Sequence, residues 1–218
     1  MRRFWFFDLD GTLADTDPDI RVSWKAAMAD LGLSCERFDE EFVAGPPIEE
    51  MTRRLFPDRY TEALAAAMRE RFGFHYDHDG FPNTFEYPGV MDAVRRLKAA
   101  GARTFIVTNK RYAGATAMAA KFGWNREFEG LYAGDMYKDT PLGKLRKPAL
   151  LAHVMRLLGA SPDDCVMVGD TGNDFEAAAA NGVVSVAVPW GYGHSDELER
   201  ADVRLPAGAP VDFLAAVE

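Results

Sequence analysis

Cysteine is scarce in this 218-residue chain, which contains only Cys35 and Cys165. Two cysteines are too few for a disulfide framework, and the sequence has no Cys-x-x-Cys pair and no cysteine–histidine ligand spacing. This scarcity excludes a small disulfide-stabilised domain and a cysteine-ligated zinc module. We expect both cysteines to be buried as small apolar side chains.

Basic residues are outnumbered, with 25 Lys and Arg against 34 Asp and Glu, so the formal net charge is −9. Nucleic acids and anionic membrane surfaces select basic protein surfaces, and we therefore expect neither as a partner. A small anionic ligand remains compatible with this charge, because a bound cation reverses the field locally.

Long hydrophobic runs are absent as well. The apolar run near the N-terminus covers only residues 4–7, whereas a signal peptide needs roughly 7–15 apolar residues and a membrane span about 18. The hydrophobic fraction of 48% and the charged fraction of 27% are typical of globular proteins and exclude a disordered chain. We therefore expect a soluble, cytoplasmic protein built as one domain, or as one domain that carries an insertion.

Four short apolar runs, each about as long as a strand, are spread along the chain. Their apolar residues are continuous rather than alternating, which is typical of strands buried on both faces. The runs are residues 4–7, 104–107, 165–168 and 183–188. Helical patterns separate them; Val90, Val94 and Leu97, for example, repeat at helical spacing before Gly101. Strands that alternate with helices predict an α/β fold, with a doubly wound, Rossmann-like parallel sheet at its core.

Residues 15–85 interrupt this alternation. They contain no buried strand run, but they do contain helical stretches around residues 20–31, 48–56 and 61–76, punctuated by Gly and Pro. Because the segment lies between the first strand and the next strand–helix unit, we interpret it as an inserted α-helical cap domain. The catalytic core would then be made of residues 1–14 and 86–218.

Two carboxylates follow the first predicted strand, in the sequence Asp8-Leu9-Asp10-Gly11-Thr12. If strand geometry continued, both would project to the same side. At about 4 Å they would repel by roughly 4 kcal/mol at an effective dielectric constant near 20. Such a pair needs a cation, a shared proton or strong solvation. Gly11 also permits a tight turn in which backbone N–H groups face an anion. The alternative is an ordinary solvated turn, in which Asp and Gly are common.

Polar side chains follow two further strands. Thr108, Asn109 and Lys110 come after the run 104–107, and all three side chains can donate hydrogen bonds to phosphate oxygens. Asp170 and Asp174 follow the run 165–168 beside glycines, and between these segments Lys147-Pro148 opens a predicted helix. Ligands of open α/β sheets bind outside the carboxyl ends of the strands, where these residues fall together with the first acid pair.

These four segments, in this order, resemble the motifs of the haloacid dehalogenase-like hydrolase superfamily. The resemblance covers essentially the whole chain, including the small helical cap between the first and second motifs. Within the superfamily, Asp-Leu-Asp-Gly-Thr-Leu-Ala-Asp-Thr and Thr-Asn-Lys look most like phosphoglycolate phosphatases. The segments Gly45-Pro46-Pro47-Ile48 and Trp190-Gly191-Tyr192-Gly193 resemble equally the phosphatase and the 5′-nucleotidase-like members.

The resemblance implies a role for each motif residue. Asp8 would attack phosphorus to form an aspartyl-phosphate, and Asp10 would act first as acid and then as base. Mg²⁺ would be held by Asp8, Asp170 and the backbone carbonyl of Asp10, with support from Asp174. Gly11 would lie in the phosphate-binding loop. The remaining phosphoryl contacts would come from Thr108, Asn109 and Lys147. An all-oxygen ligand set suits Mg²⁺ better than Zn²⁺.

The third motif departs from the subgroup pattern Lys-Pro-x-Pro, because Ala149 and Leu150 follow Lys147-Pro148 here. Lys138 and Lys144 lie upstream and are alternative phosphate-binding lysines, although we favour Lys147.

Several activities fit these motifs. The first is a Mg²⁺-dependent phosphomonoesterase acting on a small phosphorylated metabolite, with phosphoglycolate the first substrate to test and a nucleoside monophosphate the second. A sugar phosphomutase with the same nucleophile is an alternative, although we identify no additional acid or base in the cap. A phospho-accepting signalling domain is a third possibility and accounts poorly for the helical insertion. The sequence is compatible with a monomer or a homodimer.

Overall fold

The computed structural model describes residues 2–217. The chain forms two compact units, one made of Met1–Asp15 and Phe85–Glu218 and the other of Thr16–Thr84. Each unit has its own buried residues and is described separately below.

The first unit is built on a six-stranded parallel sheet with the order β5-β4-β1-β6-β7-β8. Its strands are β1 (Phe4–Phe7), β4 (Arg103–Thr108), β5 (Gly130–Ala133), β6 (Cys165–Gly169), β7 (Val184–Ala187) and β8 (Val203–Arg204). The central strand β1 pairs Phe7 with Ile106 of β4 on one side and with Val168 of β6 on the other. This register aligns the carboxyl ends of the three central strands at one edge of the sheet.

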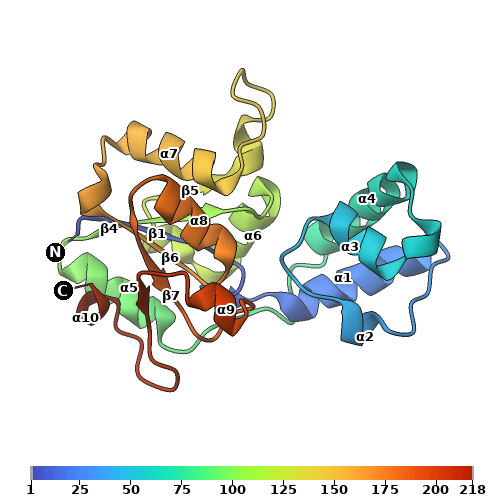
Figure 1. Ribbon diagram of the computed structural model, residues 1–218, viewed down its shortest axis with the longest axis horizontal. Helices are drawn as coiled ribbons and strands as arrows, with labels where there is room; N and C mark the ends of the chain where they lie inside the picture. The colour runs from blue at the N-terminus through green and yellow to red at the C-terminus, as the bar shows by residue number, and fades with distance from the viewer. Residues whose placement is uncertain (1, 218) are drawn as a thin grey trace. The chain divides into compact units, whose positions relative to one another are not determined.

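Helices cover both faces of this sheet, and alternate residues of β1 show why. Phe4 and Phe6 pack into a buried cluster with Leu150 and other residues of α7 and α8. Trp5 and Phe7 point to the opposite face, where both rings contact Phe213 at centroid distances of 6.4 and 5.3 Å. Figure 1 shows α7 and α8 on one side of the sheet and α5 and α10 on the other. The sheet is therefore buried on both faces, as its unbroken apolar strands require.

The helices of this unit are α5 (Val90–Ala99), α6 (Tyr112–Phe122), α7 (Lys147–Leu158), α8 (Gly172–Ala180), α9 (Ser195–Leu198) and α10 (Phe213–Ala216). Short 3₁₀ turns complete the connections: η2 (Trp124–Arg126), η3 (Gly134–Tyr137) and η4 (Pro162–Asp164). A small antiparallel ribbon pairs β2 (Ala14–Asp15) with β3 (Phe85–Glu86), where the chain leaves this unit and returns to it.

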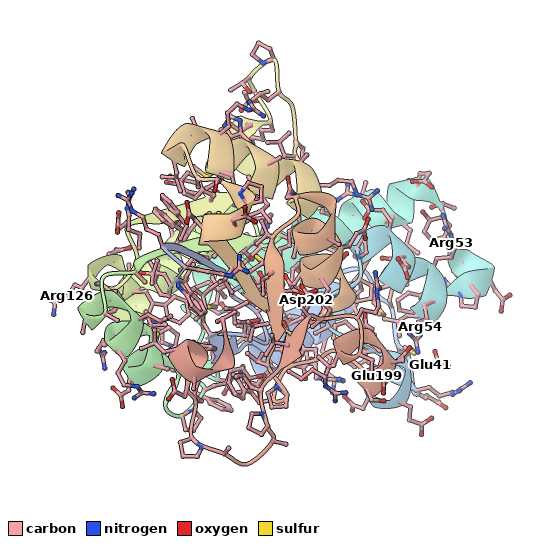
Figure 2. The ribbon with its side chains drawn as sticks, turned by 60° about the vertical axis from the view of Figure 1, so that its left-hand side comes forward. Glu41, Arg53, Arg54, Arg126, Glu199 and Asp202 are labelled. Atoms are coloured by element: carbon pink, nitrogen blue, oxygen red, sulfur yellow. The ribbon has the colours of Figure 1, made fainter. Side chains whose placement is uncertain are left out.

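The second unit is helical, with α1 (Asp17–Asp30), α2 (Phe38–Glu41), α3 (Ile48–Leu55), η1 (Pro57–Arg59) and α4 (Glu62–His78). The indole of Trp24 lies at its centre and contacts the rings of Phe42 and Phe72 at 5.4 and 5.9 Å. Arg53 and Arg54 at the end of α3 are exposed, and both are labelled in Figure 2. The Arg53 guanidinium lies 4.2 Å from the ring centroid of Tyr60.

The predicted α/β fold class is confirmed by the parallel sheet and its two helical layers. The four apolar runs correspond to β1, β4, β6 and β7, whereas β5 and β8 gave no such signal. Both of these strands lie at the edges of the sheet, where partly exposed residues replace the apolar run. Among residues 2–217, no helix is long and apolar enough to cross a membrane.

Candidate active site

Chemically active side chains collect at the carboxyl edge of the three central strands. Asp8 directly follows β1, Asp170 directly follows β6, and Lys110 lies two residues after β4. The first turns of two helices contribute side chains to this edge: Lys147 is the first residue of α7, and Asp174 lies in the first turn of α8. The topology thus brings together residues that are more than 160 positions apart in the sequence.

Asp8, Lys147 and Asp174 form a buried ion-pair cluster. The Lys147 Nζ lies 2.9 Å from Asp8 Oδ2 and 2.5 Å from Asp174 Oδ1. Burial alone would lower the pKa of the Lys147 ammonium, but the charges of Asp174 and Asp8 outweigh this effect and raise the pKa above its ordinary value. Lys147 is therefore a fixed cation, held between two carboxylates.

The surroundings of Asp8 disfavour the charged form of its carboxyl group. Burial raises the pKa of its carboxyl group to about 6, against the opposing attraction of Lys147, and the charge of Asp174 raises that pKa further. The charge of Asp10 contributes least. The expected repulsion within the Asp8–Asp10 pair is therefore secondary, because β1 ends at Phe7 and each aspartate has its own lysine.

Asp10 is paired with Lys110. The Lys110 Nζ donates to Asp10 Oδ1 at 2.8 Å, and the Lys110 side chain is only 6% exposed while that of Asp10 is 25% exposed. The Lys110 backbone N–H donates to Thr108 Oγ1 at 3.1 Å, which leaves the Thr108 hydroxyl proton available to another acceptor. Asp10 is thus the most accessible carboxylate of the site and is held by a lysine that follows the neighbouring strand β4.

Asp170 is fully buried and held at both oxygens. The Thr12 hydroxyl donates to Oδ1 at 3.0 Å and the Tyr192 backbone N–H donates to Oδ2 at 2.7 Å. These hydrogen bonds lower the pKa of Asp170, but burial and the charges of Asp174 and Asp8 prevail and raise the pKa well above its usual range. Two hydrogen bonds therefore orient the carboxylate, but no neighbouring positive charge among residues 2–217 compensates its own negative charge.

Two glycines let the backbone approach Asp170 closely. Gly11 has a φ of +76°, and a Cβ there would collide with the Asp170 carboxylate. A Cβ on Gly191 would collide with Asp170 and with the Gly11 carbonyl oxygen. Neither position accepts a side chain without displacing Asp170, so the Gly11 turn and the loop containing Gly191 form a tight cradle around it.

The remaining predicted phosphate-binding residues lie around the end of β4 and the start of α7. Thr108 is buried at the end of β4, and Asn109 is exposed beside it. Lys138 and Lys144 are exposed on the segment that precedes α7, whereas Lys147 is buried in the carboxylate cluster. Of the three candidate lysines, the structure places only Lys147 against Asp8.

The site fits a divalent cation. Asp8, Asp170 and Asp174 each direct a carboxylate oxygen to within 4.8 Å of the others. Asp8 Oδ1 is buried and accepts no hydrogen bond, which is costly for a carboxylate oxygen unless a cation binds it. Both Asp174 oxygens are engaged, one by Lys147 and the other by the backbone N–H and hydroxyl of Thr171. Each Asp170 oxygen accepts one hydrogen bond and keeps a lone pair, whereas Asp174 Oδ1 is ion-paired with Lys147 and Asp174 Oδ2 accepts two hydrogen bonds. Asp8 and Asp170 are therefore the better candidate ligands, and Asp174 contacts the site through Lys147.

The charge of the cluster agrees with this assignment. Within residues 2–217, the ion pairs of the carboxylates of Asp8, Asp10, Asp170 and Asp174 come from two ammonium groups, those of Lys110 and Lys147. Two negative charges are left uncompensated, which is the charge that one Mg²⁺ would balance. Oxygen ligands of this kind are those that Mg²⁺ prefers.

Several residues that organise the site were not identified from the sequence. Thr12 and Tyr192 orient Asp170, and the Trp190 indole N–H donates to the Thr12 carbonyl oxygen at 3.2 Å. Lys110 was expected only to be a possible phosphate donor, and its pairing with Asp10 was not foreseen. The segment 190–193 was noted for its resemblance, but nothing in the sequence shows that it folds back onto Asp170.

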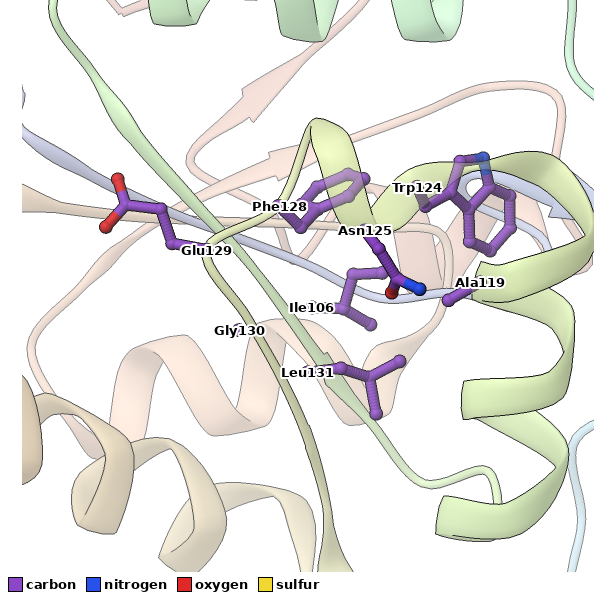
Figure 3. A pocket seen from close by; sticks show the side chains of 8 residues that line it. All are labelled: Ile106, Ala119, Trp124, Asn125, Phe128, Glu129, Gly130 and Leu131. Atoms are coloured by element: carbon purple, nitrogen blue, oxygen red, sulfur yellow. The ribbon is translucent and has the colours of Figure 1, made fainter.

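A separate cavity of about 210 Å³ lies between η2 and β5 (Figure 3). Its walls are mostly apolar and include Ile106, Trp124, Phe128 and Leu131. None of the predicted site residues lines it, so this cavity is distinct from the carboxylate cluster.

Comparisons with known proteins agree with this geometry. The model of the haloacid dehalogenase-like hydrolase family matches residues 5–182. The phosphoglycolate phosphatase of Chromobacterium violaceum is 32% identical over 201 residues, which cover 88% of this chain and 87% of that protein. The tyrosine-protein kinase PtkA of Mycobacterium tuberculosis is 31% identical over 200 residues, and the match covers 91% of this chain but only 66% of the kinase.

Solved structures share the fold. The haloacid dehalogenase-like family protein SP0104 from Streptococcus pneumoniae superimposes with a TM-score of 0.77 at 23% identity, covering 91% of this chain and 90% of that one. The match of the family model over most of the chain includes the segments that carry Asp8, Lys110, Lys147 and Asp170. The chain belongs to the haloacid dehalogenase-like hydrolase family.

Proposed function

We propose that the protein is a Mg²⁺-dependent phosphomonoester hydrolase that acts through an aspartyl-phosphate on Asp8. The observation that carries the proposal is the state of this carboxylate. It is buried, Lys147 holds its Oδ2, and its Oδ1 accepts no hydrogen bond. A carboxylate fixed by a lysine at the carboxyl edge of a parallel sheet is placed to attack a phosphorus atom bound there.

The chain's own residues supply each part of the reaction. In the first half, an Asp8 oxygen forms a bond to phosphorus, the ester P–O bond breaks, and Asp10 gives its proton to the leaving oxygen. In the second half, Asp10 takes a proton from water as the water oxygen attacks phosphorus and the bond to Asp8 breaks. Thr108 and Lys147 donate hydrogen bonds to the phosphoryl oxygens, and Asn109 completes this set. When bound at Asp8 and Asp170, Mg²⁺ compensates the negative charge that carboxylates and a phosphate dianion bring together.

Phosphoglycolate is the first substrate to test. Its support is the identity of 30–32% to curated phosphoglycolate phosphatases from several bacteria, including Chromobacterium violaceum and Colwellia psychrerythraea. A nucleoside monophosphate is the next candidate, because the motifs resemble nucleotidase-like members as well.

Phosphate release from a panel of small phosphomonoesters, with and without Mg²⁺, tests the proposal. We expect Mg²⁺-dependent turnover that Asp8→Asn abolishes, and the matched substitution Asp163→Asn at an exposed aspartate to leave turnover unchanged. A folded protein that releases no phosphate from any ester in the presence of Mg²⁺ would contradict it.

A second candidate is phosphoryl transfer to a protein tyrosine. Its support is the match to the PtkA kinases, of which this chain spans 66% of the length. Two assays separate the activities. A kinase transfers label from labelled ATP to a tyrosine-containing peptide, whereas the proposed hydrolase leaves the peptide unlabelled and releases phosphate from small esters.

A further inference from the structure

Lys110 is buried beside the site without being part of the Asp8–Lys147–Asp174 cluster. Its ammonium lies 2.8 Å from Asp10 Oδ1, and its side chain is 6% exposed. Its backbone N–H is held by Thr108 Oγ1 at the end of β4. The lysine is therefore fixed at both ends, at its backbone by Thr108 and at its ammonium by the carboxylate of Asp10.

The contact constrains how Asp10 can act. Asp10 lies in the turn after β1, where its backbone forms a bridge with Ala14 and the Gly11 N–H donates to the Ala14 carbonyl. The turn fixes the main chain, and Lys110 fixes the side chain through one oxygen. With Oδ1 held by the ammonium, Oδ2 is the oxygen that carries the proton in an acid step.

We propose that Lys110 is a positioning residue for Asp10: it holds Oδ1 so that Oδ2 faces the leaving oxygen and, later, the attacking water. The inference rests on the proposed hydrolase function. In the step that it serves, the P–O bond breaks, its electron pair stays on the leaving oxygen, and that oxygen takes the proton from Asp10 Oδ2. Displacing a reacting group by about 1 Å costs on the order of 100-fold in rate, so the effect of losing Lys110 is measurable.

A leaving-group comparison tests the role. An alkyl phosphate needs a proton on its leaving oxygen, whereas p-nitrophenolate leaves without one. In pre-steady-state measurements with Mg²⁺, we expect Lys110→Met to slow the first half-reaction of the alkyl ester about 100-fold. With the p-nitrophenyl ester, the burst of p-nitrophenolate should stay within about threefold of its rate in the unsubstituted protein. Slow release of phosphate should follow the burst. The matched substitution Lys121→Met, at an exposed lysine of α6, should change neither rate.

A double-mutant cycle gives a second, independent measurement. If Lys110 acts through Asp10, then Lys110→Met causes no further loss of the alkyl-ester rate in an Asp10→Asn background. Equal loss with both esters in the single variant, or losses that multiply in the double variant, would overturn the proposal and assign Lys110 to phosphate binding or folding. Failure of the hydrolase function is distinguishable, because the unmodified protein would then turn over neither ester.

Discussion

The Thr12 hydroxyl controls the orientation of a metal-ligand candidate from a fully buried position. It donates to Asp170 Oδ1 at 3.0 Å, and the Thr12 carbonyl in turn accepts from the Trp190 indole. Through its side chain and its backbone carbonyl, this one residue links the turn after β1, the end of β6 and the segment 190–193. Such outer-shell partners fix the direction in which a ligand presents its lone pairs.

We predict that Thr12→Val weakens Mg²⁺ binding about 10- to 100-fold, because it removes one hydrogen bond to Asp170 and keeps the side-chain shape. Calorimetric titration of the purified protein with Mg²⁺ measures the effect without any substrate. Thr12→Ser, which restores the hydroxyl, should recover most of the affinity. Unchanged affinity in the valine variant would show that Asp170 needs no help from Thr12.

At the scale of the elements, Asp19 ties the start of α1 to the end of the helical unit. Its carboxylate is 4% exposed and accepts hydrogen bonds from the Asn83 backbone N–H and side-chain amide and from the Thr84 hydroxyl, at 2.6–3.1 Å. Both segments that enter and leave this unit are therefore held by one charged group.

We expect Asp19→Ala to destabilise this unit by at least about 2 kcal/mol, because hydrogen bonds to a charged group contribute roughly 1.5–3 kcal/mol and their donors would be left unpaired. Hydrogen exchange should show faster opening of residues 16–30 and 80–84. Asp39→Ala removes an exposed ion pair with Lys25 and should cost under about 1 kcal/mol. Similar effects of the two substitutions would contradict the assigned role.

Glu127 joins the segment after η2 to α5. Its carboxylate accepts from Arg95 Nε at 3.0 Å and from Lys98 Nζ at 3.2 Å. Partial burial alone would raise the pKa of Glu127, but the hydrogen bonds and charges of Arg95 and Lys98 outweigh it and lower the pKa below 4.5. A lowered pKa in the folded state means that the charged form stabilises the fold.

The resulting contribution to stability is complete above the unfolded pKa of Glu127 and is lost as the pH falls through its folded pKa. We predict that Glu127→Gln lowers the free energy of unfolding by roughly 1 kcal/mol at pH 7 and that this difference shrinks below pH 4.5. Urea denaturation across this range measures it. The control Glu36→Gln, at an exposed glutamate, should change the free energy of unfolding little, and a constant deficit in Glu127→Gln would rule out the ion pairs as its cause.

What the sequence could predict at this scale depended on burial. Strands buried on both faces gave continuous apolar runs, so β1, β4, β6 and β7 were found from them, and the motif residues at their ends followed. The edge strand β5 has mostly half-buried residues and gave no run. Contacts such as Lys110 with Asp10, or Tyr192 with Asp170, join segments 100 and 22 residues apart and depend on loop conformation, which local patterns do not encode.

At the scale of the whole molecule, part of the excess negative charge is concentrated at one buried place. The chain carries a net charge of −9, and the buried cluster of Asp8, Asp170 and Asp174 concentrates part of it in one of the two units. Raised pKa values at Asp8 and Asp170 show that the folded chain alone does not neutralise these carboxylates. The uncompensated charge destabilises this edge of the sheet, and the cation of the proposed site would relieve that cost.

We predict that Mg²⁺ raises the melting temperature and that the gain is confined to the unit containing the sheet. A ligand that binds only the folded state stabilises it by about 2.7 kcal/mol at one hundred times its dissociation constant. Hydrogen exchange should show the protection at the ends of β1 and β6 and not in residues 16–84, which contribute none of the clustered carboxylates. Asp170→Asn should abolish the response, whereas Asp163→Asn should keep it. Protection centred on residues 16–84, or a full response in Asp170→Asn, would place the cation elsewhere and remove the charge argument on which the proposed site depends.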